Sequence, residues 1–298
     1  MTLLAVPNFS EGRDPSVIAA LRAALDARGG VLDRHSDTEH NRTVLTVAGE
    51  NRHLPYQLAH AAEIAIERID MNRHRGLHPC IGALDVCPIV WLTEAGREPA
   101  VQQARLIARL LAELSLPIFL YGDLASSEQR RERAFFREGG LEELRRRMAS
   151  GDLDPDLGPP APHPTGGATL VTARPPLAAF NVELDTTDAV VAQRVAAGLR
   201  EGGGGLPGVR AIGLPLERMR SQVSTNVHDP IAVPLRKVVA TVAELAAPHG
   251  ARPVEAELVG LVPQAALIGF PPDVPIRDFD PDRQVIERRI GRLSGEPR

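Results

Sequence analysis

The order of apolar and polar positions divides the first half of the chain into short strands and amphipathic helices. Residues 3–9 form an apolar run of strand length, and Asp14-Pro15 then supplies an N-cap and a proline suited to the first helical turn. Apolar residues recur after that point at helical spacing until Gly29-Gly30. The same rhythm predicts strands over 31–37, 42–49, 83–92 and 117–122 and helices over 54–69 and 99–114. Short connections between such elements are typical of the α/β class.

The second half of the chain begins with a strand again and follows a compact order. The pattern predicts strands over 177–184, 209–213, 221–227 and 253–262 and helices over 189–199 and 234–247. This β-α-β-β-α-β order is that of the ferredoxin-like split unit, and the first half shows a similar order with extra helices. Between the halves, the Pro/Gly-rich segment 152–167 has the composition of a linker or a binding loop.

One segment of the first half is dense in charge. Residues 127–149 carry seven Arg and five Glu around apolar positions. An anion-binding patch is one interpretation, but the balance of the two signs favours a solvated helical face.

Composition removes several function classes. Of the 34 Lys and Arg residues only Lys237 is a lysine, and no glycine loop precedes it, which argues against a phosphate-binding loop or a Schiff-base enzyme. The net charge of −4 and an aromatic content of 3% do not provide the basic footprint and stacking surfaces of a nucleic-acid binder. Arg109 and Glu113 interrupt the best candidate for a membrane span. Two cysteines and an N-terminus without a cationic leader favour the cytoplasm.

The first of three polar clusters follows the first predicted strand, at residues 6–13. Ligands of α/β sheets favour strand ends, and Asn8, Ser10 and Arg13 could hold carboxylates there. A turn that caps the following helix explains the same residues equally well.

The second cluster occupies a predicted strand-turn-strand over 33–42, where carboxylates, imidazoles and a guanidinium crowd together. His35, Asp37 and His40 would be its candidate metal ligands. No well-spaced remote ligand set accompanies them, so we expect no metal.

The third cluster spans 73–86 and leads into a buried strand. His74 and His78 are four residues apart, but Gly76 and Pro79 argue against a helix. We therefore expect a loop that brings a histidine to the mouth of the strand, where an imidazole can act as a general acid or base. A thiol nucleophile at Cys80 is the competing interpretation, and inert packing of that side chain is favoured over it.

Motifs along the whole chain agree with one family. They are Val-Pro-Asn-Phe-Ser-Glu-Gly-Arg at 6–13, His-Asn-Arg-Thr-Val at 40–44, His-Pro at 78–79 with Gly-Ala-Leu-Asp-Val at 82–86, Tyr-Gly at 121–122, Gly-Pro at 158–159, Gly-Ala-Thr at 167–169, Ala-Phe-Asn at 179–181, Val-Ser-Thr-Asn at 223–226 and Val-Gly-Leu-Val-Pro at 259–263. Each motif is short, but in this order they resemble the glutamate formiminotransferase family.

The resemblance implies a transferase that moves the formimino group of N-formimino-L-glutamate to N5 of tetrahydrofolate, the co-substrate, in histidine degradation. It implies two α/β subdomains, 1–176 and 177–298, that are ferredoxin-like sandwiches and enclose a cleft, in a homodimer. The expected partners are small molecules, without a metal, a prosthetic group, nucleic acid or a membrane. Some relatives carry a fused cyclodeaminase domain, for which this chain ends too early.

The resemblance assigns a catalytic histidine and a folate-binding loop, and the chemistry of the transfer suggests roles for further residues. The family's catalytic histidine falls on His78, which we expect to move a proton from folate to the leaving glutamate nitrogen. Asp37 would favour the cationic formimino carbon, and Arg13 and Arg42 would bind carboxylates, although structural salt bridges explain these arginines equally well. The folate-binding loop falls on 158–167. The remaining substrate- or folate-binding candidates are Asn8, Ser10, His35, Gly158, Pro159, His163, Thr165, Gly166 and Gly167.

Three positions depart from the family pattern. Cys80 stands where an arginine is expected, His35 where some relatives are acidic, and Thr172 where a glycine is expected. Two alternatives therefore stay open. One is an amidine hydrolase that uses the same histidine with water in place of folate, and the other is a folate-binding paralogue without turnover.

Overall fold

The computed structural model describes residues 2–26, 30–50, 52–76, 79–216 and 220–294 of the chain. Contacts divide it into two compact units, Met1–Arg174 and Pro175–Arg298, and each is described by itself. Among the helices of the described residues, none has the length and apolar content that crossing a bilayer requires.

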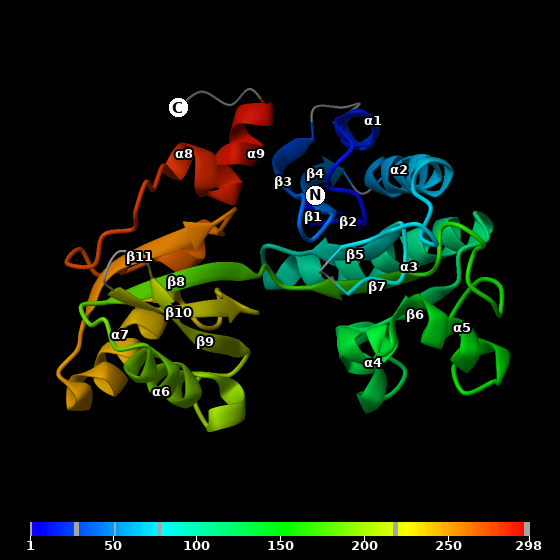
Figure 1. The fold of residues 1–298 in the computed structure, drawn as a ribbon. Coiled ribbons are helices and arrows are strands. Elements are labelled where there is room, and N and C mark those ends of the chain that lie inside the picture. Colours follow the sequence, from blue (N-terminus) through cyan, green and yellow to red (C-terminus); the bar gives the residue numbers. More distant parts are fainter. Residues whose placement is uncertain (1, 27–29, 51, 77–78, 217–219, 295–298) are drawn as a thin grey trace. The chain divides into compact units, whose positions relative to one another are not determined.

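The first unit is built on a seven-stranded mixed sheet (Figure 1). β1 and β2 share one position between β4 and β5, β3 pairs with the far side of β4, and β7 and β6 extend the sheet beyond β5. β7 runs parallel to both β5 and β6. The strands are β1 (Thr2–Ala5), β2 (Asn8–Phe9), β3 (Val31–Asp37), β4 (Arg42–Glu50), β5 (Leu84–Val90), β6 (Ile118–Leu120) and β7 (Thr169–Arg174).

Three helices of this unit pack on one face of the sheet, and two short ones cover part of the other face (Figure 1). Helix α1 begins where the sequence predicts, because Asp14 Oδ1 accepts a hydrogen bond from the backbone of Ser16. β6 and β7 are buried over most of their length on both faces. The two buried threonines of β7 are satisfied by backbone carbonyls, since Thr169 Oγ1 donates to Leu84 O and Thr172 Oγ1 donates to Tyr121 O, each at 2.7 Å. The helices are α1 (Pro15–Asp26), α2 (Leu54–Arg68) and α3 (Arg97–Glu113) on one face and α4 (Arg133–Arg137) and α5 (Gly140–Ala149) on the other.

Two expectations for the first unit are wrong in detail. The strand expected over 3–9 is divided into β1 and β2 at Val6 and Pro7, and the proline nitrogen has no hydrogen to donate to the ladder. The sequence pattern also missed β7, because this strand is short and directly follows the Pro/Gly-rich segment.

The second unit is a four-stranded antiparallel sheet in the order β11-β8-β10-β9, with α6 and α7 on one face (Figure 1). This order with a β-α-β-β-α-β sequence is the ferredoxin-like split unit, and β1 to β5 with α1 and α2 repeat it in the first unit. The expected fold class of two such α+β units is therefore confirmed. The elements are β8 (Ala178–Leu184), α6 (Ala189–Leu199), β9 (Val209–Leu216), β10 (Arg220–Val227), α7 (Leu235–Ala246) and β11 (Pro253–Val259).

After β11 the chain returns to the edge of that strand, and Ile276 forms a parallel bridge with Ala256. The backbone of Ala256 donates to Pro275 O at 2.8 Å and accepts from Arg277 N at 2.8 Å, so the edge strand is covered. Two short helices follow, α8 (Pro281–Gln284) and α9 (Ile286–Ser294). Single turns of 3-10 helix lie at Glu94–Gly96, Gly122–Leu124, Glu128–Arg131, Glu201–Gly203, Ala247–His249 and Gln264–Leu267.

Candidate functional site

The turn after β2 is held against the start of β5 by Ser10. Its Oγ donates to Gly82 O at 2.7 Å and its backbone nitrogen donates to Ala83 O at 2.9 Å. Asn8 is also buried, and its amide donates to Val6 O at 2.6 Å. Both candidate ligand residues therefore hold the backbone at this strand end, and neither caps α1, whose first turn is capped by Asp14.

Asn41 connects all three polar clusters, a role that the sequence interpretation missed. It is buried in the left-handed region with φ 50°, which asparagine tolerates better than most residues. Its Oδ1 accepts from Gly12 N at 2.9 Å, and its Nδ2 donates to Arg75 O at 3.2 Å and lies 3.3 Å from His74 Nδ1. Because an amide nitrogen can only donate, His74 Nδ1 must accept, and a neutral His74 carries its proton on Nε2. Burial lowers the pKa of His74 and so favours that neutral form.

A buried carboxylate lies behind the third cluster. Asp85 accepts from Ile81 N at 2.8 Å with one oxygen and pairs with Arg137 through the other. Burial lowers the pKa of nearby Arg42 to about 10, which leaves it charged at neutral pH, and the Asp85 carboxylate opposes this shift. Burial and the same carboxylate raise the pKa of Cys80 to about 11. The thiol is thus protonated at neutral pH, which supports the packing interpretation over a thiolate nucleophile.

A pocket of about 870 Å³ opens beside these groups in the first unit. His78 lies outside the described residues, but Gly76 and Pro79, on either side of that segment, both contribute to the pocket wall. Asn8, Ser10, Arg42 and Asp85 line a narrower hollow that shares Cys80 with the pocket. The pocket is lined by Arg13, Glu39, Met71, His74, Arg75, Gly76, Pro79, Cys80, Arg137, Gly140 and Leu141.

The segment expected to bind folate is attached to the framework at two places. At one end, Gly158 adopts φ 86° and packs on Leu116 O at the approach to β6, with Pro159 next in sequence. Near the other end of the segment, the carbonyl of Thr165 accepts a hydrogen bond from Met71 N at 2.8 Å. Met71 is a residue of the pocket wall, so this part of the loop lies beside the pocket.

The turn within this loop is closed by backbone hydrogen bonds between His163 and Gly167, at 2.8 and 3.1 Å. The ring of His163 adds to it, because its Nδ1 accepts from Gly166 N at 2.9 Å. Gly166 O in turn accepts from Ala83 N at 2.9 Å, which fastens the turn to the segment that leads into β5.

Asp37 and His35 of the second cluster lie on β3. Asp37 Oδ1 accepts from the backbones of Glu39 and His40, each at 2.8 Å, and lies 3.1 Å from His40 Nδ1. These contacts with His40 lower the pKa of Asp37, so its carboxylate is ionised at neutral pH. His35 is exposed, and neither His35 nor Asp37 contributes to the wall of the pocket or of the narrower hollow. Within the described ranges, His, Cys, Asp and Glu side chains form no group of three suited to a metal ion.

Arg137 is a pocket residue for which the sequence favoured a solvated position. The solvated-face interpretation of 127–149 is wrong for Arg137, whose side chain is only 9% exposed. It is also wrong for Arg130, which pairs with Asp156 at 2.7 Å and lies over the rings of Phe119 and Phe136. The two adjacent phenylalanines at 135–136 are the sequence signal that indicates burial, since both pack in the apolar cluster on this face of the sheet and Arg137 follows them directly.

Comparison with known proteins agrees with these motifs. Residues 2–174 match the model of the formiminotransferase domain, N-terminal subdomain, and residues 179–270 match that of the formiminotransferase domain. The chain belongs to the formiminotransferase family. It is 38% identical to the glutamate formimidoyltransferase of Streptococcus pyogenes serotype M1, over 88% of this chain and 89% of that protein. This formiminotransferase is thus a transferase, with formimidoyl transfer as the family's activity.

Two further relatives show how the family varies in length. The glutamate formimidoyltransferase of Thermoplasma acidophilum is 35% identical, over 88% of both chains. The formimidoyltransferase-cyclodeaminase of Gallus gallus is 40% identical over 88% of this formiminotransferase, which spans only 50% of that longer protein. The solved structure of a peptidase M16 inactive domain from Pseudomonas fluorescens aligns with 83% of this chain and 74% of that domain's chain, at 12% identity. Its TM-score of 0.19 is too low to say anything about the fold.

Proposed function

We propose that this formiminotransferase moves the formimino group from N-formimino-L-glutamate to N5 of tetrahydrofolate, in the breakdown of histidine. The observation that carries the proposal is the 38% identity to a glutamate formimidoyltransferase over nearly its whole length. Tetrahydrofolate is a co-substrate that is consumed, and the chemistry needs no metal. The proposal also includes a cytoplasmic location and a homodimer. Light scattering of the purified protein would measure its mass in solution and so test the homodimer.

The reaction needs one proton to move between two nitrogens. N5 of tetrahydrofolate attacks the formimino carbon and forms a C–N bond, and His78 accepts the N5 proton. The bond from that carbon to the glutamate nitrogen then breaks, and His78 returns the proton to the leaving amine. Gly76 and Pro79 support this assignment, because both flank the histidine in sequence and contribute to the pocket wall.

Charged side chains suit the groups that the substrates bring. The formimino carbon is cationic or nearly neutral through the step, so a carboxylate nearby would stabilise it. Asp37 is ionised but lines neither the pocket nor the hollow, so it would act on that carbon only from a distance. Arg13 lines the pocket, so its guanidinium could pair with a substrate carboxylate. Arg42 lines the hollow beside it, which is too narrow for a water molecule, so Arg42 could reach a carboxylate only if that hollow widened. The loop 163–167 would contact folate from the side of Met71.

The test is an absorbance assay of 5,10-methenyltetrahydrofolate formation, coupled through excess cyclodeaminase. Wild type should turn over, and His78→Ala should lose about 10²–10⁴-fold in kcat if the imidazole moves the proton. His60→Ala is the matched control, because His60 is an exposed histidine of α2 that pairs with Glu63. Equal rates for wild type and His78→Ala would remove His78 from the mechanism.

Two further measurements separate the alternatives. Loss of N-formimino-L-glutamate without tetrahydrofolate would identify an amidine hydrolase. Calorimetric binding of tetrahydrofolate without turnover would identify a folate-binding protein instead of an enzyme. Either result contradicts the proposed transfer.

A further inference from the structure

Arg137 is a buried arginine that keeps part of its hydrogen-bonding capacity unused. It is the last residue of α4, and its Nη2 pairs with Asp85. Its Nε is buried and, within the described part of the chain, makes no hydrogen bond. The same side chain forms part of the wall of the 870 Å³ pocket. A buried donor without an acceptor is costly in a folded protein, so its position at a pocket points to a ligand.

A second unused group lines the same pocket. His74 Nε2 is buried and has no hydrogen-bond partner among the described residues. The backbone of Ser10 lies near the ring and raises the pKa of His74, but it does not meet hydrogen-bond geometry with Nε2. Since Asn41 makes Nδ1 an acceptor, Nε2 is the protonated nitrogen. Arg137 Nε and His74 Nε2 are therefore both donors: Nε lacks an acceptor among the described residues, and Nε2 has only the Ser10 backbone close to it.

The charge of the pocket wall favours an anion as that acceptor. Three arginines, Arg13, Arg75 and Arg137, and one glutamate, Glu39, contribute to the wall. A guanidinium binds a carboxylate through two parallel hydrogen bonds, and it does so best when its orientation is fixed. Asp85 provides that orientation, because it is itself held by the backbone of Ile81 and takes only one edge of the Arg137 fork.

We infer that Arg137 binds a substrate's glutamate carboxylate in this pocket, with His74 Nε2 as a second donor. Asp85 is the positioning residue that aims Arg137. The inference rests on the proposed function for the identity of the carboxylate, because N-formimino-L-glutamate and the tail of tetrahydrofolate both carry one. Cys80 stands where the family pattern has an arginine, and it contributes to the same pocket wall as Arg137. Arg137 therefore supplies a cation beside a position at which this chain has a neutral thiol.

The experiment removes both charges together. Arg137→Gln alone would leave the Asp85 carboxylate buried without its partner, so a fold defect could imitate a binding defect. The double variant D85N/R137Q keeps an acceptor for Ile81 N and a neutral amide pair in place of the ion pair. Arg146→Gln is the matched control, because Arg146 is an exposed arginine of α5 that pairs with Glu143 away from the pocket wall. Circular dichroism and urea unfolding establish that each variant is folded.

Steady-state kinetics then measure KM for each substrate in turn. We expect D85N/R137Q to raise one KM by about ten- to hundredfold, with kcat changed by less than about threefold. A rise for N-formimino-L-glutamate assigns the donor's carboxylate, and a rise for tetrahydrofolate assigns the folate tail. A folded double variant with both KM values unchanged would overturn the inference.

Calorimetry tests the same contact without turnover, so that this inference and the proposed function can fail separately. The probes are N-formyl-L-glutamate and 5-formyltetrahydrofolate, which present the two carboxylates without reacting. Binding of either probe to wild type that weakens at least tenfold in D85N/R137Q supports the inference, even if the enzyme assay shows no transfer. Equal binding by the two proteins, or no binding of either probe to wild type, contradicts it.

Discussion

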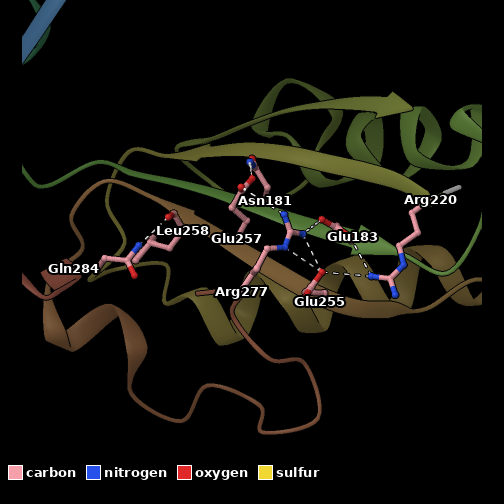
Figure 2. Close-up of polar contacts among 8 residues, drawn as sticks. All are labelled: Asn181, Glu183, Arg220, Glu255, Glu257, Leu258, Arg277 and Gln284. Atoms are coloured by element: carbon pink, nitrogen blue, oxygen red, sulfur yellow. Dashed lines mark hydrogen bonds and ion pairs between the residues drawn. The ribbon is translucent and has the colours of Figure 1, made fainter. Parts of the chain in front are cut away.

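Arg277 pairs with the carboxylate of Glu183, which has no solvent exposure and lies on the face of the sheet opposite α6 and α7 (Figure 2). Arg277 comes from the segment that covers β11, and it crosses that strand to reach β8. It also contacts Glu255 at 2.9 Å, while Arg220 approaches Glu183 at 3.2 Å from β10 (Figure 2). The chain after β11 is thus tied to the sheet by charge as well as by backbone hydrogen bonds.

Arg277→Ala should destabilise the second unit by about 2 kcal/mol, because it removes a charged partner from a buried carboxylate that Arg220 only partly compensates. Urea unfolding measures the change. Arg252→Ala is the control, since Arg252 is an exposed arginine that pairs with Asp185, and we expect it to change stability by less than about 1 kcal/mol. Equal effects of the two substitutions would contradict the importance of burial.

Asn41→Asp should raise the pKa of His74. The carboxylate keeps an acceptor for Gly12 N but replaces the amide donor beside His74 Nδ1 with a negative charge. An adjacent anion favours the protonated ring, which opposes the lowering caused by burial. Titration of the histidine ring signals by NMR gives the pKa directly, and the exposed His60 should not shift. A His74 pKa that stays at its wild-type value would show that Asn41 does not control this ring.

His74 should make the protein less stable as the pH falls below about 6.5, the ordinary pKa of histidine. Its folded-state pKa lies below that value, so the unfolded chain takes up the proton first and unfolding becomes more favourable in acid. His74→Asn keeps an acceptor for the amide of Asn41 but cannot titrate. The decrease in the free energy of unfolding between about pH 6.5 and the folded-state pKa of His74 should therefore be smaller in this variant. Urea unfolding at a series of pH values measures this, with His60→Asn as the variant that should behave like wild type.

Cys80 should react slowly with iodoacetamide at pH 7.5. Its pKa is raised to about 11, so only a very small fraction is thiolate at that pH, and the alkylation rate should still be rising above pH 9. Cys80→Ala should keep kcat within about threefold of wild type, because the thiol is not placed as a nucleophile. Mass spectrometry of the alkylated protein follows the reaction, and Cys87, which is fully buried, should be labelled only after unfolding. Fast labelling of Cys80 at neutral pH would overturn the packing interpretation.

Gly167→Ala should damage the loop 163–167. The glycine has φ 71°, and a Cβ added there would lie 2.1 Å from the backbone oxygen of Ile81, so the turn must move. We expect a loss of stability of more than about 2 kcal/mol. Gly151→Ala is the matched control, since it has φ 77° but no atom within 4 Å of its added Cβ, so only the backbone strain of about 1 kcal/mol applies. Thermal unfolding compares the two variants.

Much of the fold follows from local pattern. The apolar stripe after Asp14 forms α1, and the predicted strand 177–184 corresponds to β8 with a difference of one residue at its start. β7 could not be found in the same way, because its polar residues Thr169 and Thr172 are three positions apart and both buried, so the strand shows neither an apolar run nor a period of two. Its place depends on parallel pairing with β5 and β6.

The candidate site, like the fold, has features that the sequence showed and features that only the structure showed. Its three polar clusters were visible as dense groups of polar residues, and their order was enough to identify the family. The left-handed position of Asn41 and its links to Gly12 and His74 were not visible, because they join segments that are distant in sequence. The histidine that shuttles the proton stays a prediction, carried by the motif around residue 78.

Element order, the α+β class and family membership could therefore be inferred from the amino-acid order alone, because periodicity and short motifs are local properties. Which charges are buried could not. Arg137 and Asp85 are 52 positions apart, and Arg277 and Glu183 are 94 positions apart. Whether such an arginine is solvated or held in the interior depends on the carboxylate that folding brings to it, since a charge leaves water only where a partner replaces the solvent.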